Sequence, residues 1–157
     1  MTASLVTAEM EQLLGRDYPP VTYDVERSGI RLWARAVGYT DPVYYDLSCA
    51  RERGHHDLPA PPGFLGHERY GADQEIGSQG PPIRGLNPRL TRSLNGGTEY
   101  EYHDTVHAGD VLVATGRFTN YRQREGSIGP MLIIRREVVF RRDGVPVVVM
   151  RATVINH

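Results

Sequence analysis

The sequence is poor in cysteine, in long apolar runs and in net charge. Cys49 is the only cysteine, so no internal disulfide can form, as is usual for proteins of a reducing cytoplasm. No apolar run approaches the roughly 20 residues that a membrane span needs, and the N-terminus shows no basic-then-apolar signal pattern. We therefore expect a cytoplasmic protein that does not contact membranes.

Charge of one sign is also lacking, because 18 basic and 19 acidic residues leave a net charge of −1. Such a chain has no large electrostatic field with which to attract nucleic acid, and we expect no nucleic-acid partner. Arginines do gather in the last third of the sequence, which we interpret as solvated strand faces and turn flanks. The alternative is that they attract a phosphorylated carrier such as coenzyme A. These arginines are Arg122, Arg124, Arg135, Arg136, Arg141 and Arg142.

Several chemical motifs are absent. The sequence has no glycine-rich dinucleotide fingerprint, no phosphate-binding loop and no Gly-x-Ser-x-Gly nucleophile turn. The run His55-His56-Asp57 has no third ligand at a familiar zinc spacing, and His67-Glu68 lacks the second histidine of a zinc protease. The sequence therefore predicts no metal site.

Residues 1–157 are expected to form one domain, and its first part alternates short helices with a strand. Thr7 to Leu14 predicts a helix with Thr7 as its N-cap, and Val21 to Val25 alternates like a half-buried strand. Ser28 is expected to cap the next helix, which ends at Gly38 and has Trp33 in its core face. A further helix is expected from Tyr44 to Arg53.

The remainder changes from one helix to a β-rich pattern. Phe64 to Tyr70 predicts a helix, and Gly71 to Asn87 is rich in loop-forming residues. Asp143-Gly144 is a strong signal for a hairpin between strands. We predict an α+β fold, in which an antiparallel sheet wraps around the helix at Phe64–Tyr70. The strands are expected near Gly97–His103, Val111–Gln123, Ile128–Phe140 and Val145–Ile155.

The stretch from Gly38 to Tyr44, Gly-Tyr-Thr-Asp-Pro-Val-Tyr, carries a family resemblance. In MaoC-like (R)-specific enoyl-thioester hydratases, a helix ends in Gly-Asp-x-Asn-Pro-(aliphatic)-His, and the Asp and His activate one water. Tyr39 stands at the position of that Asp and Tyr44 at the position of that His. A tyrosine with a pKa near ~10 is a poor general base at neutral pH. The frame of the catalytic loop is present without its acid/base pair.

Three further stretches extend the resemblance to about Gly15–His157. They are Ala60-Pro61-Pro62-Gly63-Phe64, the run from Leu94 to Asp110, and the run from Glu125 to Leu132. The chain resembles the FAS1-like, or MaoC N-terminal, branch of hot-dog dehydratases. The resemblance implies a hot-dog fold, action on coenzyme A or acyl-carrier-protein thioesters of fatty acid metabolism, and no cofactor. It also implies pairing, either as a homodimer or as a heterodimer with a catalytic MaoC-like subunit.

The resemblance also implies a substrate site at Ala60–Leu65. In working members, a backbone N–H at the start of the central helix polarises the thioester carbonyl, and Gly63 is the matching residue here. The expected acyl-binding residues are Tyr44, Pro61, Pro62, Gly63, Phe64 and Leu65. Asp41 and His103 are the first candidates for catalysis, although Asp41 before Pro42 is also an ordinary turn former.

Our leading interpretation is a subunit of an enoyl-thioester hydratase or 3-hydroxyacyl-thioester dehydratase, non-catalytic itself and needed to shape the acyl pocket. One alternative is a stand-alone hydratase in which Asp41, His103 or His67 supplies unusual acid/base groups. The other is an acyl-thioester binding protein without enzymatic activity.

Overall fold

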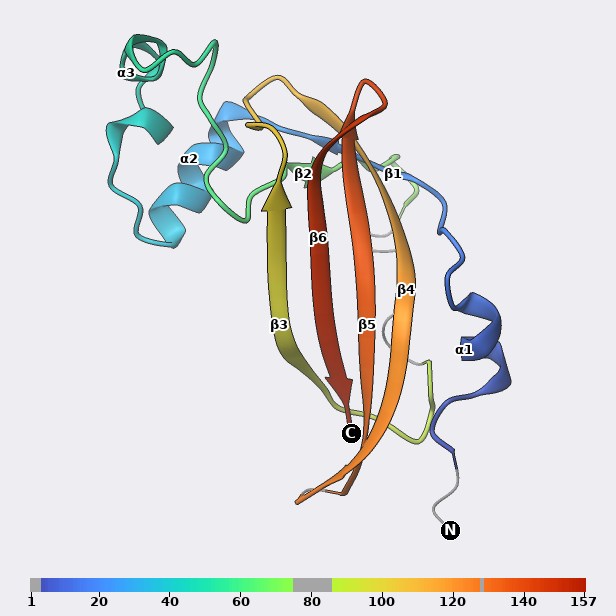
Figure 1. Cartoon of the computed structure of the whole chain (residues 1–157). Helices are drawn as coiled ribbons and strands as arrows, with labels where there is room; N and C mark the ends of the chain where they lie inside the picture. The colour runs from blue at the N-terminus through green and yellow to red at the C-terminus, as the bar shows by residue number, and fades with distance from the viewer. Residues whose placement is uncertain (1–3, 75–85, 128) are drawn as a thin grey trace.

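One six-stranded antiparallel sheet forms most of the molecule (Figure 1). The computed structural model describes residues 4–74, 86–127 and 129–157. The strand order is β2-β1-β4-β5-β6-β3, so β3 lies at one edge of the sheet. The strands are β1 (Val21–Asp24), β2 (His67–Glu68), β3 (Ser93–Tyr102), β4 (Val111–Gly126), β5 (Gly129–Arg142) and β6 (Val145–Asn156).

The strands β4, β5 and β6 form an antiparallel meander, and β3 pairs with β6 at its edge. The positions of these four strands confirm the strand predictions. In the first half of β4, buried side chains such as Leu112, Ala114 and Phe118 alternate with more exposed ones, because successive residues point to opposite faces. Asp143 and Gly144 connect β5 to β6 with φ angles of +50° and +81°. Two positive φ values in a two-residue loop match the twist of a hairpin, which confirms the Asp-Gly prediction.

The helices are short and lie outside the sheet in Figure 1, with α2 and α3 at one end and α1 near β4. They are α1 (Ala8–Leu13), α2 (Arg27–Ala36), the 3-10 helix η1 (Pro42–Tyr44) and α3 (Leu47–Glu52). Thr7 caps α1 as predicted, since its side chain accepts a hydrogen bond from the N–H of Met10. The predicted Ser28 cap is wrong, because α2 begins at Arg27 and its N-cap is Glu26.

The helix predicted from Tyr44 to Arg53 is shorter than expected. Asp46 starts α3 by accepting a hydrogen bond from the N–H of Cys49, which separates that helix from η1. In the described part of the chain, no helix is long and apolar enough to cross a membrane.

The prediction of a central helix at Phe64–Tyr70 is wrong. Gly63 and Gly66 adopt φ angles of +86° and +93°, which a right-handed helix cannot include. A Cβ at Gly66 would lie 2.6 Å from the carbonyl oxygen of Asp24, so the chain passes too close to β1 for any other residue. It continues into β2, which pairs with β1. The predicted loop Gly71–Asn87 lies largely outside the described residues.

The buried apolar side chains form two clusters. The larger one joins the helical end to the sheet and includes Ile30, Val43, Leu58, Phe64 and Phe140. The smaller one lies between α1 and the far half of the meander. Its buried members are Leu5, Met10, Leu86, Phe118, Leu132 and Ile134. The larger cluster holds the segments that surround the cavity described next.

Candidate functional site

A cavity of about 610 Å³ lies where the helical end meets the sheet. One wall is formed by η1 and by the chain that follows α3, and the other by the end of β3 and the turn after it. Backbone hydrogen bonds join the two walls, from Ala60 N–H to Val106 O and from Ala108 N–H to Leu58 O. The lining residues are Val43, Tyr44, Arg53, His55, Pro59, Ala60, Pro62, Tyr102, His103, Asp104, Thr105 and Val106.

The degenerate hydratase motif lies at this cavity. Tyr44 is part of the lining, and its ring stacks on Tyr39 with 5.8 Å between centroids. Burial, followed by the nearby charges of Asp41 and Tyr39, raises the pKa of the Tyr44 hydroxyl above its ordinary value. Tyr44 therefore keeps its proton at neutral pH, and it can donate a hydrogen bond but cannot act as a general base.

Asp41 forms part of a turn instead of facing the cavity. Its Oδ1 accepts a hydrogen bond of 3.0 Å from the N–H of Val43, and its Oδ2 lies 2.8 Å from Nη1 of Arg53. Arg53 first, and then the Val43 N–H, lowers the pKa of this carboxyl below its ordinary value. The turn-former interpretation of Asp41 is confirmed by these contacts. As a base, Asp41 is weakened by both of them.

Gly63 does not begin a helix, so the predicted contribution of a helix N-terminus at this position is wrong. Its N–H donates a 2.7 Å hydrogen bond to the hydroxyl of Tyr102, a residue of the cavity lining at the end of β3. The neighbouring Pro62 also lines the cavity. The backbone donor that the resemblance assigns to the thioester carbonyl is therefore present and already engaged by the protein.

The other predicted acyl-binding residues lie deeper. Phe64 and Leu65 are 4% and 7% exposed and belong to the larger core cluster, and Pro61 is fully buried. None of the three lines the cavity. Trp33, predicted to be core, is 38% exposed, with its ring 5.9 Å from that of Phe64. Pro61, Phe64 and Leu65 therefore lie behind the residues that line the cavity, and Trp33 lies outside it.

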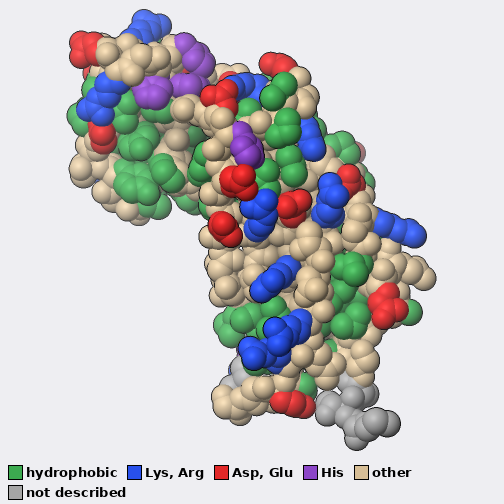
Figure 2. Space-filling view, in the orientation of Figure 1, with side chains coloured by type: hydrophobic (Ala, Val, Ile, Leu, Met, Phe, Trp, Pro, Cys, Tyr) green, Lys and Arg blue, Asp and Glu red, His purple; other side chains and the backbone are tan. Residues whose placement is uncertain are grey.

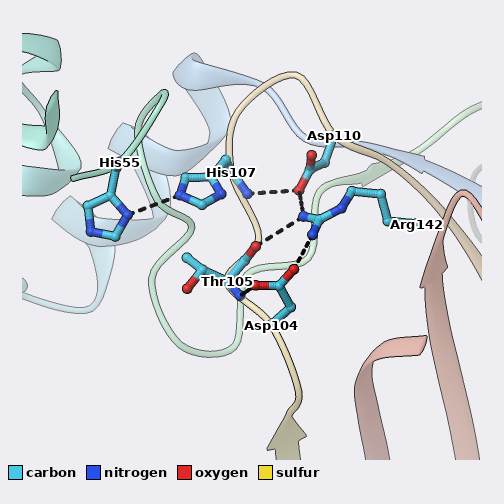
Figure 3. Close-up of polar contacts among 6 residues, drawn as sticks. All are labelled: His55, Asp104, Thr105, His107, Asp110 and Arg142. Atoms are coloured by element: carbon cyan, nitrogen blue, oxygen red, sulfur yellow. Dashed lines mark hydrogen bonds and ion pairs between the residues drawn. The ribbon is translucent and has the colours of Figure 1, made fainter. Parts of the chain in front are cut away.

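His103 lines the cavity, as the sequence suggested it could, but its side chain is 44% exposed and its nearest carboxylate, on Glu101, is 3.6 Å away. His55 also lines the cavity, although no functional role was predicted for it from the sequence. Its Nδ1 lies 3.0 Å from Nε2 of His107, which is only 8% exposed (Figure 3). The ring of His56 lies 4.1 Å from that of His107. No sequence pattern joins residues so far apart.

Arg142 holds the turn that carries Thr105 and His107 (Figure 3). Its guanidinium donates to Asp110 Oδ2 at 2.8 Å, to the carbonyl of Thr105 at 3.1 Å, and to the carboxylate of Asp104. Asp104 and Asp110 are thereby both engaged by one guanidinium, and the three groups together keep one net negative charge. In the described residues, no group of three or more His, Cys, Asp or Glu side chains is arranged to hold a metal ion.

The face of the sheet seen in Figure 2 mixes acidic and basic side chains over its middle, as expected from the balanced composition. Arg151 pairs with Glu101 at 2.8 Å and with Glu137 at 3.2 Å, across three neighbouring strands. Arg151 is not one of the arginines grouped in the sequence. Within that group, the interpretation as solvated strand faces fails for Arg136, whose Nε is buried without a hydrogen-bond partner among the described residues. The cavity thus combines apolar side chains, two phenol groups and two imidazoles, with the carboxylate of Asp104 engaged by Arg142.

Comparisons with solved structures identify the fold. The chain superimposes on a chain of the ChsH1–ChsH2 complex from Mycobacterium tuberculosis with a TM-score of 0.67 and 18% identity, covering 88% of this chain and 87% of that one. A chain of the C-terminally truncated HadBC (3R-hydroxyacyl-ACP dehydratase) complex from the same organism gives a TM-score of 0.67 and 19% identity, covering 91% and 96%. The fold is therefore the hot-dog fold, as predicted.

Sequence comparison places the chain in a family. A UPF0336 protein of Streptomyces griseus is 36% identical over 118 residues, which cover 74% of this chain and 76% of that protein. The family model described as "FAS1-like, dehydratase domain region" matches residues 12–150. This match includes the degenerate motif, the Ala60–Phe64 stretch and most of the meander, and it confirms the resemblance seen in the sequence. The chain belongs to the family of FAS1-like dehydratase domains.

Proposed function

We propose that this chain is the non-catalytic subunit of an (R)-specific enoyl-thioester hydratase or 3-hydroxyacyl-thioester dehydratase, and that its cavity shapes the site for the acyl group. The observation that carries the proposal is the cavity at the degenerate motif. Tyr44 lines that cavity where working relatives have their histidine, and Asp41 is engaged in a turn. A pocket without the water-activating pair can bind an acyl thioester but cannot hydrate it efficiently.

A partner of the same fold suits two neighbouring surfaces. The edge strand β3 pairs only with β6 among the described strands, so one side of its backbone is free to pair with another chain. The α2 helix presents Leu32, Trp33 and Val37, which are 69%, 38% and 49% exposed. Trp33 borders Gly63, which is hydrogen-bonded to Tyr102 of β3, so the helix face and the strand edge are continuous. We propose that a catalytic MaoC-like subunit covers both.

The proposal is tested by co-expressing the chain with a hot-dog protein that has an intact Gly-Asp-x-Asn-Pro-x-His motif. The two should co-purify, and the complex should hydrate crotonyl-CoA. The chain alone should be slower by ~100- to 10,000-fold, the usual effect of losing a general acid/base group. Robust turnover by the purified chain, abolished by Asp41→Ala, would contradict the proposal and favour a stand-alone hydratase.

A matched pair of variants tests the proposed interface. Leu32→Glu places a charge on the exposed face of α2, and we expect at least a tenfold loss of affinity for the partner. Leu14→Glu is the control, because Leu14 is 44% exposed and bridges to Phe118 of β4, a strand that β5 and β6 separate from β3. Equal effects of the two variants would argue against the α2 face as an interface.

Tyr44 tests the shaping role of the cavity. In the complex, Tyr44→Ala should enlarge the cavity and raise KM for short acyl thioesters more than for long ones, with little change in kcat. Tyr44→Phe keeps the ring and removes only the hydroxyl, so it should retain the chain-length preference. An unchanged preference in Tyr44→Ala would mean that the acyl group is bound elsewhere.

A further inference from the structure

The pair formed by His55 and His107 is part of the cavity wall, and neither residue belongs to the family motif. His55 lies just after α3, and His107 lies in the turn that precedes β4. Their rings face each other with 3.0 Å between His55 Nδ1 and His107 Nε2 (Figure 3). Because Nδ1 of His55 points to His107, the opposite nitrogen, Nε2, is the one left for the cavity that His55 lines.

The protonation state of this pair follows from the second nitrogen of His107. A hydrogen bond between two neutral imidazoles needs one N–H and one bare nitrogen. Nδ1 of His107 is buried and has no hydrogen-bond partner among the residues that the structure describes. A proton there would make an orphaned buried donor, and such donors are rarer in proteins than under-satisfied acceptors. His107 therefore carries its proton at Nε2 and donates it to His55 Nδ1.

This arrangement fixes the tautomer of His55. Since its Nδ1 accepts the hydrogen bond from His107, the single proton of neutral His55 sits at Nε2. The two chain segments that carry the rings are joined nearby by backbone hydrogen bonds between residues 58–60 and 106–108. The cavity therefore contains an N–H donor whose direction is set by a second, buried histidine.

The surroundings of His107 favour its neutral form. Burial first, and then the neighbouring His56 and His55, lowers the pKa of His107 below its ordinary value. Asp110 opposes this effect and Arg142 adds to it. Arg142 binds both Asp110 and Asp104, so each carboxylate shares its counter-ion. Arg53, the other cation of the cavity lining, is paired with Asp41.

We propose that His55 donates a hydrogen bond from Nε2 to a neutral oxygen acceptor of the bound acyl thioester, with His107 as its positioning residue. The acceptor is either the thioester carbonyl or a 3-hydroxyl oxygen. The assignment of His55 as a donor does not depend on the proposed function, whereas the identity of its ligand rests on the proposed function. A carboxylate ligand would instead require a protonated, cationic His55.

The tautomers can be measured on the full chain with ¹⁵N-labelled histidine, because a bare ring nitrogen and a protonated one have well-separated chemical shifts. We expect both His55 and His107 to be protonated at Nε2 at neutral pH. In His107→Leu, His55 should become a mixture of tautomers while the backbone spectrum stays native, and His107→Gln should restore the single tautomer. A His55 protonated at Nδ1 in the wild-type chain overturns the inference.

The ligand is tested by titrating butyryl-CoA and 3-hydroxybutyryl-CoA into the same sample. Both should shift the His55 Nε2 signal, and His55→Leu should weaken binding about three- to tenfold, the usual effect of losing one hydrogen bond. His55→Gln retains a side-chain N–H donor and should bind like the wild type. A loss confined to the hydroxyacyl thioester assigns the 3-hydroxyl as acceptor, and an equal loss for both assigns the carbonyl.

The possible failures are distinct. If the wild-type chain shows the expected tautomers but binds neither thioester at millimolar concentration, both alone and in the complex with a catalytic partner, the acyl ligand and the proposed function are both wrong. If the thioesters bind and His55→Leu binds them as tightly as the wild type, only the role of His55 is wrong. Tighter binding of succinyl-CoA as the pH falls would show a cationic His55 and overturn the neutral donor.

Discussion

The two ends of the sheet are held by different kinds of contact. At the far end, long strands pair residue by residue and Phe118 packs at the centre of an apolar cluster. At the cavity end, short helices and turns are held by individual contacts, such as the pair Arg27–Asp57, the bond from Gly63 to Tyr102 and the contacts of Arg142. The larger apolar cluster also lies at the cavity end, so both ends supply stability, and the cavity end adds precisely placed polar contacts.

The largest effect on stability should come from the far end. Phe118 is fully buried, and its ring packs edge-on against Tyr18 at 5.3 Å. Phe118→Ala should lower the free energy of unfolding by about 3–5 kcal/mol, as a large cavity replaces the ring. Urea denaturation measures this loss. The histidine tautomers at the cavity should stay unchanged, and altered tautomers would show that the two ends are not independent.

The next effect concerns the close passage of the chain at Gly66. Gly54 and Gly66 both have positive φ, at +87° and +93°, so alanine costs about 1–2 kcal/mol of backbone strain at either site. A Cβ at Gly54 meets nothing within 4 Å, whereas at Gly66 it meets the Asp24 carbonyl oxygen at 2.6 Å. Gly66→Ala should therefore be clearly more destabilising than Gly54→Ala in thermal unfolding. Equal losses would mean that β1 shifts freely.

A smaller effect should appear in the dependence of the unfolding free energy on pH. Because burial lowers the pKa of His107 below its ordinary value, the unfolded chain takes up this proton at a higher pH than the folded chain does. The contribution of neutral His107 to stability is therefore complete above the unfolded value of about 6.5 and declines as the pH falls below it. His107→Gln should flatten the profile of unfolding free energy between pH 5 and about 7. His103→Gln is the control, because His103 is largely solvated.

The smallest effect should come from the pair that ties α2 to the cavity wall. Hydrogen bonding by Arg27 lowers the pKa of Asp57 to about 2, and Asp57 Oδ1 also accepts from the N–H of Leu58. The stabilisation by ionised Asp57 is present above its unfolded pKa and disappears as the pH falls through about 2. Asp57→Asn should lower Tm slightly at pH 7, and should make no difference in acid. If Asp57→Asn lowered Tm in acid as well, its effect would come from altered packing and not from the lost charge.

The long strands follow from the sequence because their information is local. Alternation of buried and exposed residues, together with Asp143-Gly144, is sufficient to place β4, β5 and β6. The helix at Phe64–Tyr70 fails for a reason that local patterns do not contain. Gly66 is required by the backbone of Asp24, a residue of another strand, and a positive φ there ends any helical pattern.

The site is predictable only where it follows the family motif. Tyr44 and Pro62 line the cavity because they belong to stretches that the resemblance identifies. His55 and His107 are brought together by the pairing of segments 58–60 and 106–108, which no periodicity in the sequence indicates. Trp33 has helical spacing typical of a core position, yet it is left exposed because α2 lies at the end of the sheet and does not cover its face.

The Gly63 N–H donates its hydrogen bond to the Tyr102 hydroxyl, so a ligand must compete with that hydroxyl for the same donor. A thioester carbonyl that reaches the Gly63 N–H must displace a hydroxyl that is tethered beside it, so the ligand exchanges one hydrogen bond for another and gains little from it. Tyr102 belongs to the edge strand β3, whose free side could pair with another chain. A chain that moved the end of β3 on pairing would release the donor, and ligand binding would then depend on assembly through a single hydroxyl group.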